Sequence, residues 1–116
     1  MDFTNKTAIS TGAASGMGLL FAQNIAELGG NVVMCDVNEA VLAEKVDEIN
    51  NKGKGKAIGV VCDVRDYSQV CDARDKAVEA FGSIDIMANF AGGTAVRMRK
   101  VDRNIYQEFP DVPIDI

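Results

Sequence analysis

The stretch that decides the fold is Thr11-Gly12-Ala13-Ala14-Ser15-Gly16-Met17-Gly18. It lies between an apolar run at residues 7–10 and a segment with helical periodicity, so it forms the turn from a strand into a helix. In that turn Gly12 permits the tight change of direction, Gly16 lets a pyrophosphate approach the backbone, and Gly18 allows close packing of helix on strand. An ordinary strand-to-helix turn is the alternative, but this context favours a phosphate site at the N-terminus of the helix. The loop residues predicted to bind a cofactor are Gly12, Ser15, Gly16, Met17 and Gly18.

Apolar, β-branched runs recur along the chain at a nearly constant interval. They occupy residues 7–10, 31–36, 57–62 and 84–89. The interval is roughly 25 residues, about the length of one strand-plus-helix unit. Because the runs are continuous rather than alternating, they predict parallel strands that are covered on both faces.

The segments between these runs carry the periodicity of amphipathic helices. Asp66, with Gln69 three residues later, predicts a variant of the capping box at the start of the third helix. The apolar faces expected for the three helices are Leu20, Phe21, Asn24, Ile25 and Leu28; Leu42, Val46 and Ile49; and Val70, Arg74, Ala77, Val78 and Phe81. The element order βαβαβαβ predicts a doubly wound, Rossmann-like α/β sheet with strand order 3-2-1-4. No such pattern continues through residues 94–116, so we divide the chain into a domain at 1–93 and an irregular tail at 94–116.

Asp36 closes the second predicted strand. A carboxylate at that place accepts hydrogen bonds from both hydroxyls of an adenosine ribose and repels a 2′-phosphate. Sites for NADP usually offer Arg or Lys nearby, whereas Ser15 and Val37 occupy the neighbouring positions here. This favours NAD over NADP, with Asp36 and Val37 as contacts. The alternative is a surface Asp that caps the helix beginning near Glu39.

The ends of the third and fourth strands supply the remaining candidates. Asp63, followed by Val64, is placed to accept a hydrogen bond from an adenine amino group, although a turn-stabilising Asp is an equally good interpretation. The small residues around Asn89-Phe90-Ala91-Gly92 would let a ribose or nicotinamide approach the backbone, unless they form a plain exit from the strand.

Composition limits the class of protein. The 116 residues are 47% hydrophobic and carry a net charge of −5, with no basic stripe, so nucleic acid is not expected as a partner. No run approaches the length of a membrane span, and the N-terminus does not resemble a signal peptide, so we expect a cytoplasmic protein without a membrane partner. Cys35, Cys62 and Cys71 contain no C-x-x-C pair, which predicts buried, reduced thiols. Histidine is absent and no ligand cluster is visible, so no metal site is expected.

These residues together resemble the short-chain dehydrogenase/reductase family. The resemblance rests on the spacing G-x-x-x-G-x-G in 11–18, on Asp36, on Asp63-Val64 and on Asn-x-Ala-Gly at 89–92, and it covers residues 1 to about 92. One departure is Phe90, where the family usually has a second Asn. The resemblance implies an NAD-dependent oxidoreductase that transfers a hydride between NAD and a small alcohol or carbonyl compound.

The acid/base centre that the resemblance implies, Tyr-x-x-x-Lys with a Ser, has no match in this chain. Cys71 lies four residues after Tyr67, and Pro110 lies four residues after Tyr106. We therefore name no catalytic residue and interpret the chain as the cofactor-binding half of such an enzyme, a truncated portion that is inactive alone. The fourth strand would then be an unpaired edge, which predicts a homo-oligomer.

Two other functions fit parts of the pattern. A complete, non-catalytic NAD-binding module would account for the missing acid/base centre. A methyltransferase that uses S-adenosylmethionine also has a glycine loop after its first strand, but its usual G-x-G-x-G spacing differs from that of Gly12, Gly16 and Gly18.

Overall fold

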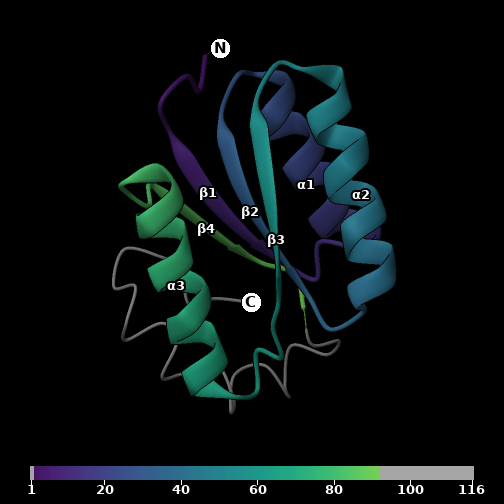
Figure 1. Ribbon diagram of the computed structural model, residues 1–116, viewed down its shortest axis with the longest axis vertical. Helices are drawn as coiled ribbons and strands as arrows, with labels where there is room; N and C mark the ends of the chain where they lie inside the picture. Colours follow the sequence, from purple (N-terminus) through teal and green to yellow (C-terminus); the bar gives the residue numbers. More distant parts are fainter. Residues whose placement is uncertain (1, 92–116) are drawn as a thin grey trace.

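The computed structural model describes residues 2–91 as a four-stranded parallel sheet with three helices (Figure 1). The sheet order is β3-β2-β1-β4, which confirms the predicted topology. The elements in chain order are β1 (Thr7–Thr11), α1 (Gly16–Glu27), β2 (Asn31–Asp36), α2 (Glu39–Lys52), β3 (Lys56–Val61), α3 (Tyr67–Phe81) and β4 (Ile86–Asn89).

The helices lie in two layers, one on each face of the sheet. Helices α1 and α2 share one apolar cluster with alternate strand residues, among them Val32 and Met34. Helix α3 packs on the other face against Ile9, Val33 and Cys35. Figure 1 shows α1 and α2 together on one side of the strands and α3 on the other. Successive strand residues therefore enter opposite cores, as continuous apolar runs require.

Strand β1 lies in the middle of the sheet and is buried along its whole length. It pairs with β2 from Thr7 opposite Asn31 and with β4 from Ala8 opposite Ile86. The third and fourth strands are shifted slightly from their predicted bounds, since Cys62 follows β3 and β4 begins only at Ile86.

The predicted apolar face of α1 holds for Ile25, which is buried, and for Phe21, which is partly buried and packs against the core, but not for Leu20 and Asn24. Leu20 is 50% exposed and Asn24 is also exposed, whereas the buried residues are Gly18, Ala22, Ile25 and Ala26. Small side chains allow the helix to approach the sheet closely, so the contact stripe follows residue size rather than hydrophobicity. In α3 likewise, Ala73 is buried and Val78 is 47% exposed.

The starts of α2 and α3 are capped by side chains. Asn38 caps α2 by accepting from the N–H of Val41, so the alternative in which Asp36 caps this helix is wrong. Asp66 caps α3 by accepting from the N–H of Ser68, as predicted. Gln69 does not reach back to the N–H of Asp66, as a standard capping box would require; its amide oxygen accepts from the N–H of Asp63 instead.

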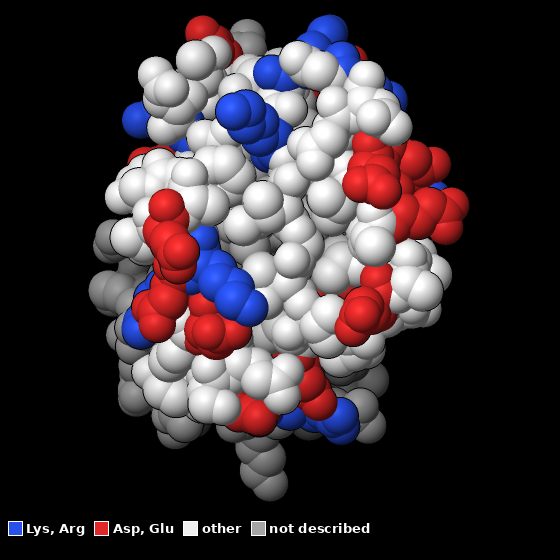
Figure 2. Space-filling model, viewed as in Figure 1, with Lys and Arg blue, Asp and Glu red and all other residues white. Residues whose placement is uncertain are grey.

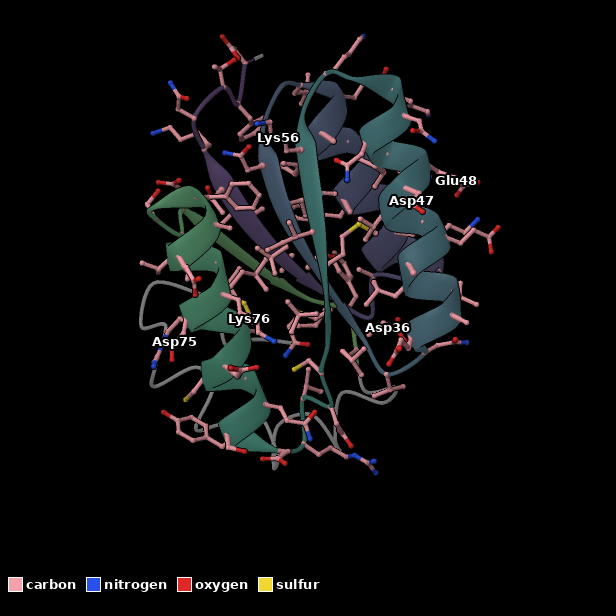
Figure 3. All side chains as sticks on the ribbon, viewed as in Figure 1. Asp36, Asp47, Glu48, Lys56, Asp75 and Lys76 are labelled. Carbon is pink, nitrogen blue, oxygen red and sulfur yellow. The ribbon has the colours of Figure 1, made fainter. Side chains whose placement is uncertain are left out.

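The edge strand β3 carries one charged side chain, Lys56 at its start. On the face drawn in Figure 2, acidic side chains gather over α2, both signs occur over α3, and the surface between them is uncharged below a basic side chain at its upper end. Figure 3 places Asp47 and Glu48 on α2, and Asp75 and Lys76 on α3. Across residues 2–91, no helix has the length and apolar character needed to cross a membrane.

Candidate functional site: the carboxyl edge of the sheet

The glycine loop is shaped by two close backbone contacts and one open position. Gly12 has φ of +65°, and a Cβ there would lie 3.0 Å from the backbone nitrogen of Ala91. A Cβ on Gly18 would lie 2.3 Å from the carbonyl oxygen of Gly12, so this residue allows α1 to pack on the end of β1. Gly16 has φ of +58°, and nothing lies within 4 Å of the place of its Cβ. Space beside the backbone therefore exists at the residue expected to face a pyrophosphate.

The start of α1 differs from the starts of the other two helices. Its N-cap residue, Ser15, makes no side-chain capping hydrogen bond within residues 2–91, and no acidic residue lies in its first turn. Ser15 and Gly16 are exposed, and Met17 is 65% exposed. The first N–H groups of a helix lack intrahelical acceptors, so this terminus can offer donors and a positive dipole end to an anion.

The loop is bonded directly to the end of β2. The N–H of Ala13 donates to the carbonyl of Cys35 at 3.0 Å, and the N–H of Ala14 donates to Oδ2 of Asp36 at 3.0 Å. Oδ1 of Asp36 accepts from the N–H of Asn38, also at 3.0 Å. Figure 3 shows Asp36 at the carboxyl end of its strand, beside the start of α2. Both oxygens of one carboxylate are thus fixed by backbone donors beside the glycine loop.

The surroundings of Asp36 carry no partner of opposite charge. Among the described residues, no Lys or Arg forms an ion pair with this carboxylate. Its neighbour Val37 is 64% exposed. The residue that follows Asp36 in the chain is therefore an exposed apolar residue and not a cation.

Thr11 fastens the end of β1 to the end of β4. Its hydroxyl donates to Oδ1 of Asn89 and accepts from the N–H groups of Phe90 and Ala91, at 3.1 and 3.3 Å. The predicted contacts at the end of β4 are therefore held close to Gly12. Gly92, the last of them, lies outside the described residues.

The ring of Phe90, which is 40% exposed, packs against a ring of helix α1. The ring centroid lies 5.8 Å from that of Phe21 on α1, with the planes tilted by 49°. Such tilted pairs are favourable beyond the area that they bury. The departure from the family pattern thus adds a contact between α1 and the end of β4.

Asp63 makes its contacts within its own turn. Its carboxylate accepts from Nε of Arg65 at 3.0 Å and from a terminal guanidinium nitrogen of the same residue at 2.8 Å. The hydrogen bond and charge of Arg65 lower the pKa of Asp63 to about 2. Val64 is buried in the core under α3, so only its backbone faces the edge of the sheet. These contacts agree with the turn interpretation of Asp63, and adenine would meet the carboxylate only beside this guanidinium.

Three residues shape the site without having been singled out from the sequence. Thr11 joins two strands, the N–H of Ala14 holds Asp36, and the buried hydroxyl of Ser10 donates to the carbonyl of Gly18 at 2.9 Å. Two of them are hydroxyl residues inside an apolar strand that runs into the glycine loop, which is the signal available in the sequence. The role of Ala14 is carried by its backbone and has no such signal.

The described residues hold no group of three or more His, Cys, Asp or Glu side chains suited to a metal ion. Of the thiols, Cys35 and Cys62 are buried as expected, whereas Cys71 is only partly buried. The carboxyl edge is thus an arrangement of backbone donors, one fixed carboxylate and small residues.

Comparison with known proteins places this edge in a family. The family model described as short chain dehydrogenase matches residues 6–112. Diacetyl reductase [(S)-acetoin forming] of Staphylococcus epidermidis is 41% identical over 92 residues, which are 79% of this chain and 35% of that protein. The match favours the dehydrogenase interpretation over the methyltransferase alternative.

Solved structures of dehydrogenases and reductases have a similar fold. A short chain dehydrogenase/reductase from Burkholderia phymatum in complex with NAD has a TM-score of 0.71 and 41% identity, covering 75% of this chain and 31% of its own. L-sorbose reductase from Gluconobacter frateurii, complexed with NADPH and L-sorbose, has a TM-score of 0.73 and 28% identity, covering 78% and 35%. The chain spans about a third of the length of the relatives that it matches. It belongs to the short-chain dehydrogenase family.

Proposed function

We propose that this chain is the cofactor-binding portion of an NAD-dependent oxidoreductase, which transfers a hydride between NAD and a small alcohol or carbonyl compound. The observation that carries the proposal is the carboxylate of Asp36, held by the N–H groups of Ala14 and Asn38 beside the glycine loop. The nicotinamide ring, when bound, supplies or accepts the hydride. The residues of this chain would bind and orient the cofactor.

The phosphate end is assigned to the glycine loop. Gly12 and Gly18 bring β1, β4 and α1 together, and the open backbone at Gly16 leaves room for a pyrophosphate. The uncapped start of α1, with Ser15 and Met17, offers N–H donors to that group. No charged side chain is needed, because the helix terminus supplies the positive potential.

The preference for NAD over NADP follows from charge. A ribose with both hydroxyls free can donate to Asp36, whereas a 2′-phosphate would bring a dianion against the same carboxylate. Ser15 and Val37, the neighbours, carry no positive charge that could offset this repulsion. Both cofactors occur in the similar structures, NAD in that from Burkholderia phymatum and NADPH in L-sorbose reductase, so the preference belongs to local residues.

The two ends of the cofactor are assigned to the ends of β3 and β4. Asp63 and the backbone of Val64 would contact the adenine, with the guanidinium of Arg65 beside the Asp63 carboxylate. Asn89, Phe90, Ala91 and Gly92 would contribute mainly backbone atoms toward the nicotinamide ribose, since the Phe90 ring is turned to α1.

The acid/base centre of the enzyme is assigned to polypeptide other than these 116 residues. We propose residues 1–93 as the NAD-binding half-domain and 94–116 as the connection to a second half that holds a Tyr-x-x-x-Lys centre and the substrate pocket. The chain alone would then bind NADH without turning it over. A cytoplasmic location and a homo-oligomeric state complete the proposal.

Titration of the 116-residue chain with NADH and NADPH, followed by nicotinamide fluorescence, tests the assignment. We expect NADH to bind more tightly, and Asp36→Asn to reduce the ratio of the two affinities by about tenfold, since one charge–phosphate repulsion and one acceptor are lost. Glu39→Gln is the matched control, because it removes a nearby negative charge at the start of α2 and should leave the ratio unchanged.

Each result bears on one part of the proposal. Absence of binding by both cofactors would refute cofactor binding, and tighter binding of NADPH would refute the preference for NAD. Steady oxidation of NADH by the chain with a carbonyl compound would refute its inactivity alone.

A further inference from the structure

Two of the three cysteines lie together beneath the carboxyl edge of the sheet. Cys35 is opposite Val60 in the register of β2 with β3, and Cys62 follows two residues after Val60. The N–H of Cys62 donates to the carbonyl of Asp36 at 3.1 Å, so the backbone pairing continues to this residue. Because side chains alternate along a strand, those of Cys35 and Cys62 lie on the same face of the sheet. Both belong to the apolar cluster under α3.

The two thiols lie in one apolar cluster, and they are not equivalent. Interaction with the Cys35 thiol lowers the pKa of Cys62. Interaction with the Cys62 thiol, together with burial, raises the pKa of Cys35 well above its usual value. Cys62 is therefore the better nucleophile of the pair.

Both thiols are buried, with Cys35 1% and Cys62 3% exposed, so an oxidant reaches either of them only when the structure opens locally. Cys35 lies in β2, an interior strand, whereas Cys62 follows β3, an edge strand that pairs only with β2 within residues 2–91. Its neighbour Val61 is 47% exposed, and Asp63 continues into a surface turn. Local opening at the end of an edge strand costs less than opening of the sheet interior, so a small oxidant reaches Cys62 first.

We propose that Cys35 and Cys62 form a reversible intramolecular disulfide, with hydrogen peroxide as the oxidant. The thiolate of Cys62 attacks one peroxide oxygen, the O–O bond breaks, and the released hydroxide takes a proton to become water. The sulfur of Cys35 then attacks the sulfenic acid, the S–O bond breaks, and the second oxygen leaves as water with the proton of Cys35. Two thiols lose two electrons and one peroxide becomes two water molecules.

The bond would alter the edge of the sheet where the cofactor is assigned. A disulfide brings the two sulfurs to about 2.05 Å, whereas Cys62 is offset by two residues from the register partner of Cys35, so the ends of β2 and β3 must draw together. Asp36 follows Cys35 directly, and Asp63 follows Cys62. On the basis of the proposed function, oxidation should therefore weaken binding of NADH.

Mapping of the bridge in the 116-residue chain tests the pairing itself. After brief treatment of the reduced, folded chain with limiting peroxide, we expect two of the three thiols to be lost, with a bridged peptide joining Cys35 to Cys62 and with Cys71 still open to alkylation. Dithiothreitol should restore all three thiols. In denaturant the shorter loop makes Cys62–Cys71 the favoured pair, so a native preference for Cys35–Cys62 reports the folded geometry. A native bridge to Cys71, or overoxidation of Cys62 without a bridge, would overturn the proposal.

Two variants distinguish formation of the Cys35–Cys62 disulfide from oxidation of single thiols. Cys71→Ser should still form the bridge, whereas Cys35→Ser should leave Cys62 to accumulate as sulfenic and sulfinic acid. Bridge formation that is slower in folded Cys71→Ser than in the same variant in denaturant would count against a preformed pair.

The coupling to the cofactor has its own readout. In Cys71→Ser, we expect oxidation to weaken NADH binding about fivefold or more and dithiothreitol to reverse the change. If the reduced chain does not bind NADH at all, the proposed function is refuted. The disulfide is then still tested separately, by mapping of the bridged peptide. Equal binding by the reduced and bridged forms would refute the coupling.

Discussion

Asp36 closes β2 and Asp63 follows the end of the adjacent strand β3, yet their carboxylates are held in different ways. Asp36 is bonded to Ala14, which lies 22 residues away in the chain, so its orientation depends on the fold. Asp63 is bonded to Arg65, two residues away, so its orientation depends on its own turn. The first arrangement fixes a carboxylate beside the glycine loop, while the second can rearrange without disturbing the sheet.

This local pairing sets the titration of Asp63. The pKa of about 2 is due first to the side-chain hydrogen bond from Arg65, so Arg65→Gln should raise it toward the ordinary value of 3.8. Because the folded-state pKa is the lower one, the pair stabilises the fold above the unfolded value and this contribution is lost as pH falls toward 2. The pair is exposed, and we expect the effect on the free energy of unfolding to be small.

An NMR titration of the Asp63 carboxyl carbon measures this shift directly. Lys76→Gln, which removes a cation that pairs with Asp72, should leave the Asp63 titration where it is. An unchanged pKa in Arg65→Gln would show that Arg65 is not its cause.

At the scale of elements, the three helices show what a sequence pattern can and cannot predict. The capping role of Asp66 follows from residue type and position alone, because a cap needs only a short acceptor at the right place. The buried stripe of α1 does not, since Gly18, Ala22 and Ala26 face the sheet because they are small while Leu20 is left outside. Hydrophobicity predicts the buried face of a helix only where the distance between the helix and the sheet leaves room for large side chains.

The caps give a matched pair of substitutions. Asp66→Ala removes the acceptor for the N–H of Ser68 and should lower the free energy of unfolding by about 1 kcal/mol. Ser15→Ala removes no capping hydrogen bond at α1 and should change stability by much less. Urea unfolding followed by circular dichroism measures both. Equal losses in the two variants would contradict the distinction between a capped and an open helix start.

The contact of α1 with β1 makes Gly18 intolerant of a side chain. Gly18→Ala places a Cβ 2.3 Å from a backbone oxygen, which cannot move without displacing the strand end, so we expect a loss of about 3 kcal/mol or more.

Gly59→Ala is the control for this substitution. Its Cβ would meet only the side chains of Val46 and Leu42, at 3.1 and 3.3 Å, and flexible side chains can adjust. We expect a loss of about 1 kcal/mol or less in urea unfolding. A loss in Gly18→Ala no larger than that of Gly59→Ala would refute the close contact.

For the whole molecule, the sequence predicts strand order and the edge at which the site lies, since both follow from recurring strands and parallel topology. It does not predict that Ala14 holds Asp36 or that Phe90 packs on Phe21. Those contacts depend on how separate units approach one another, which no local pattern encodes. The glycine loop is thus foreseeable as a motif, while the side chains that complete the site are not.

The edge formed by β4 leads to a prediction about assembly. Within residues 2–91 this strand pairs only with β1, all four of its residues are partly exposed, and none is charged. Uncharged edge strands are prone to pair with another strand, whereas charged side chains discourage such pairing. We expect the 116-residue chain to self-associate with rising concentration in sedimentation velocity experiments. Ala88→Lys, on β4, should weaken this association, and Val61→Lys, on the opposite edge at β3, should not. A chain that remains monomeric over about a hundredfold range of concentration, with circular dichroism unchanged, would show that the β4 edge does not pair.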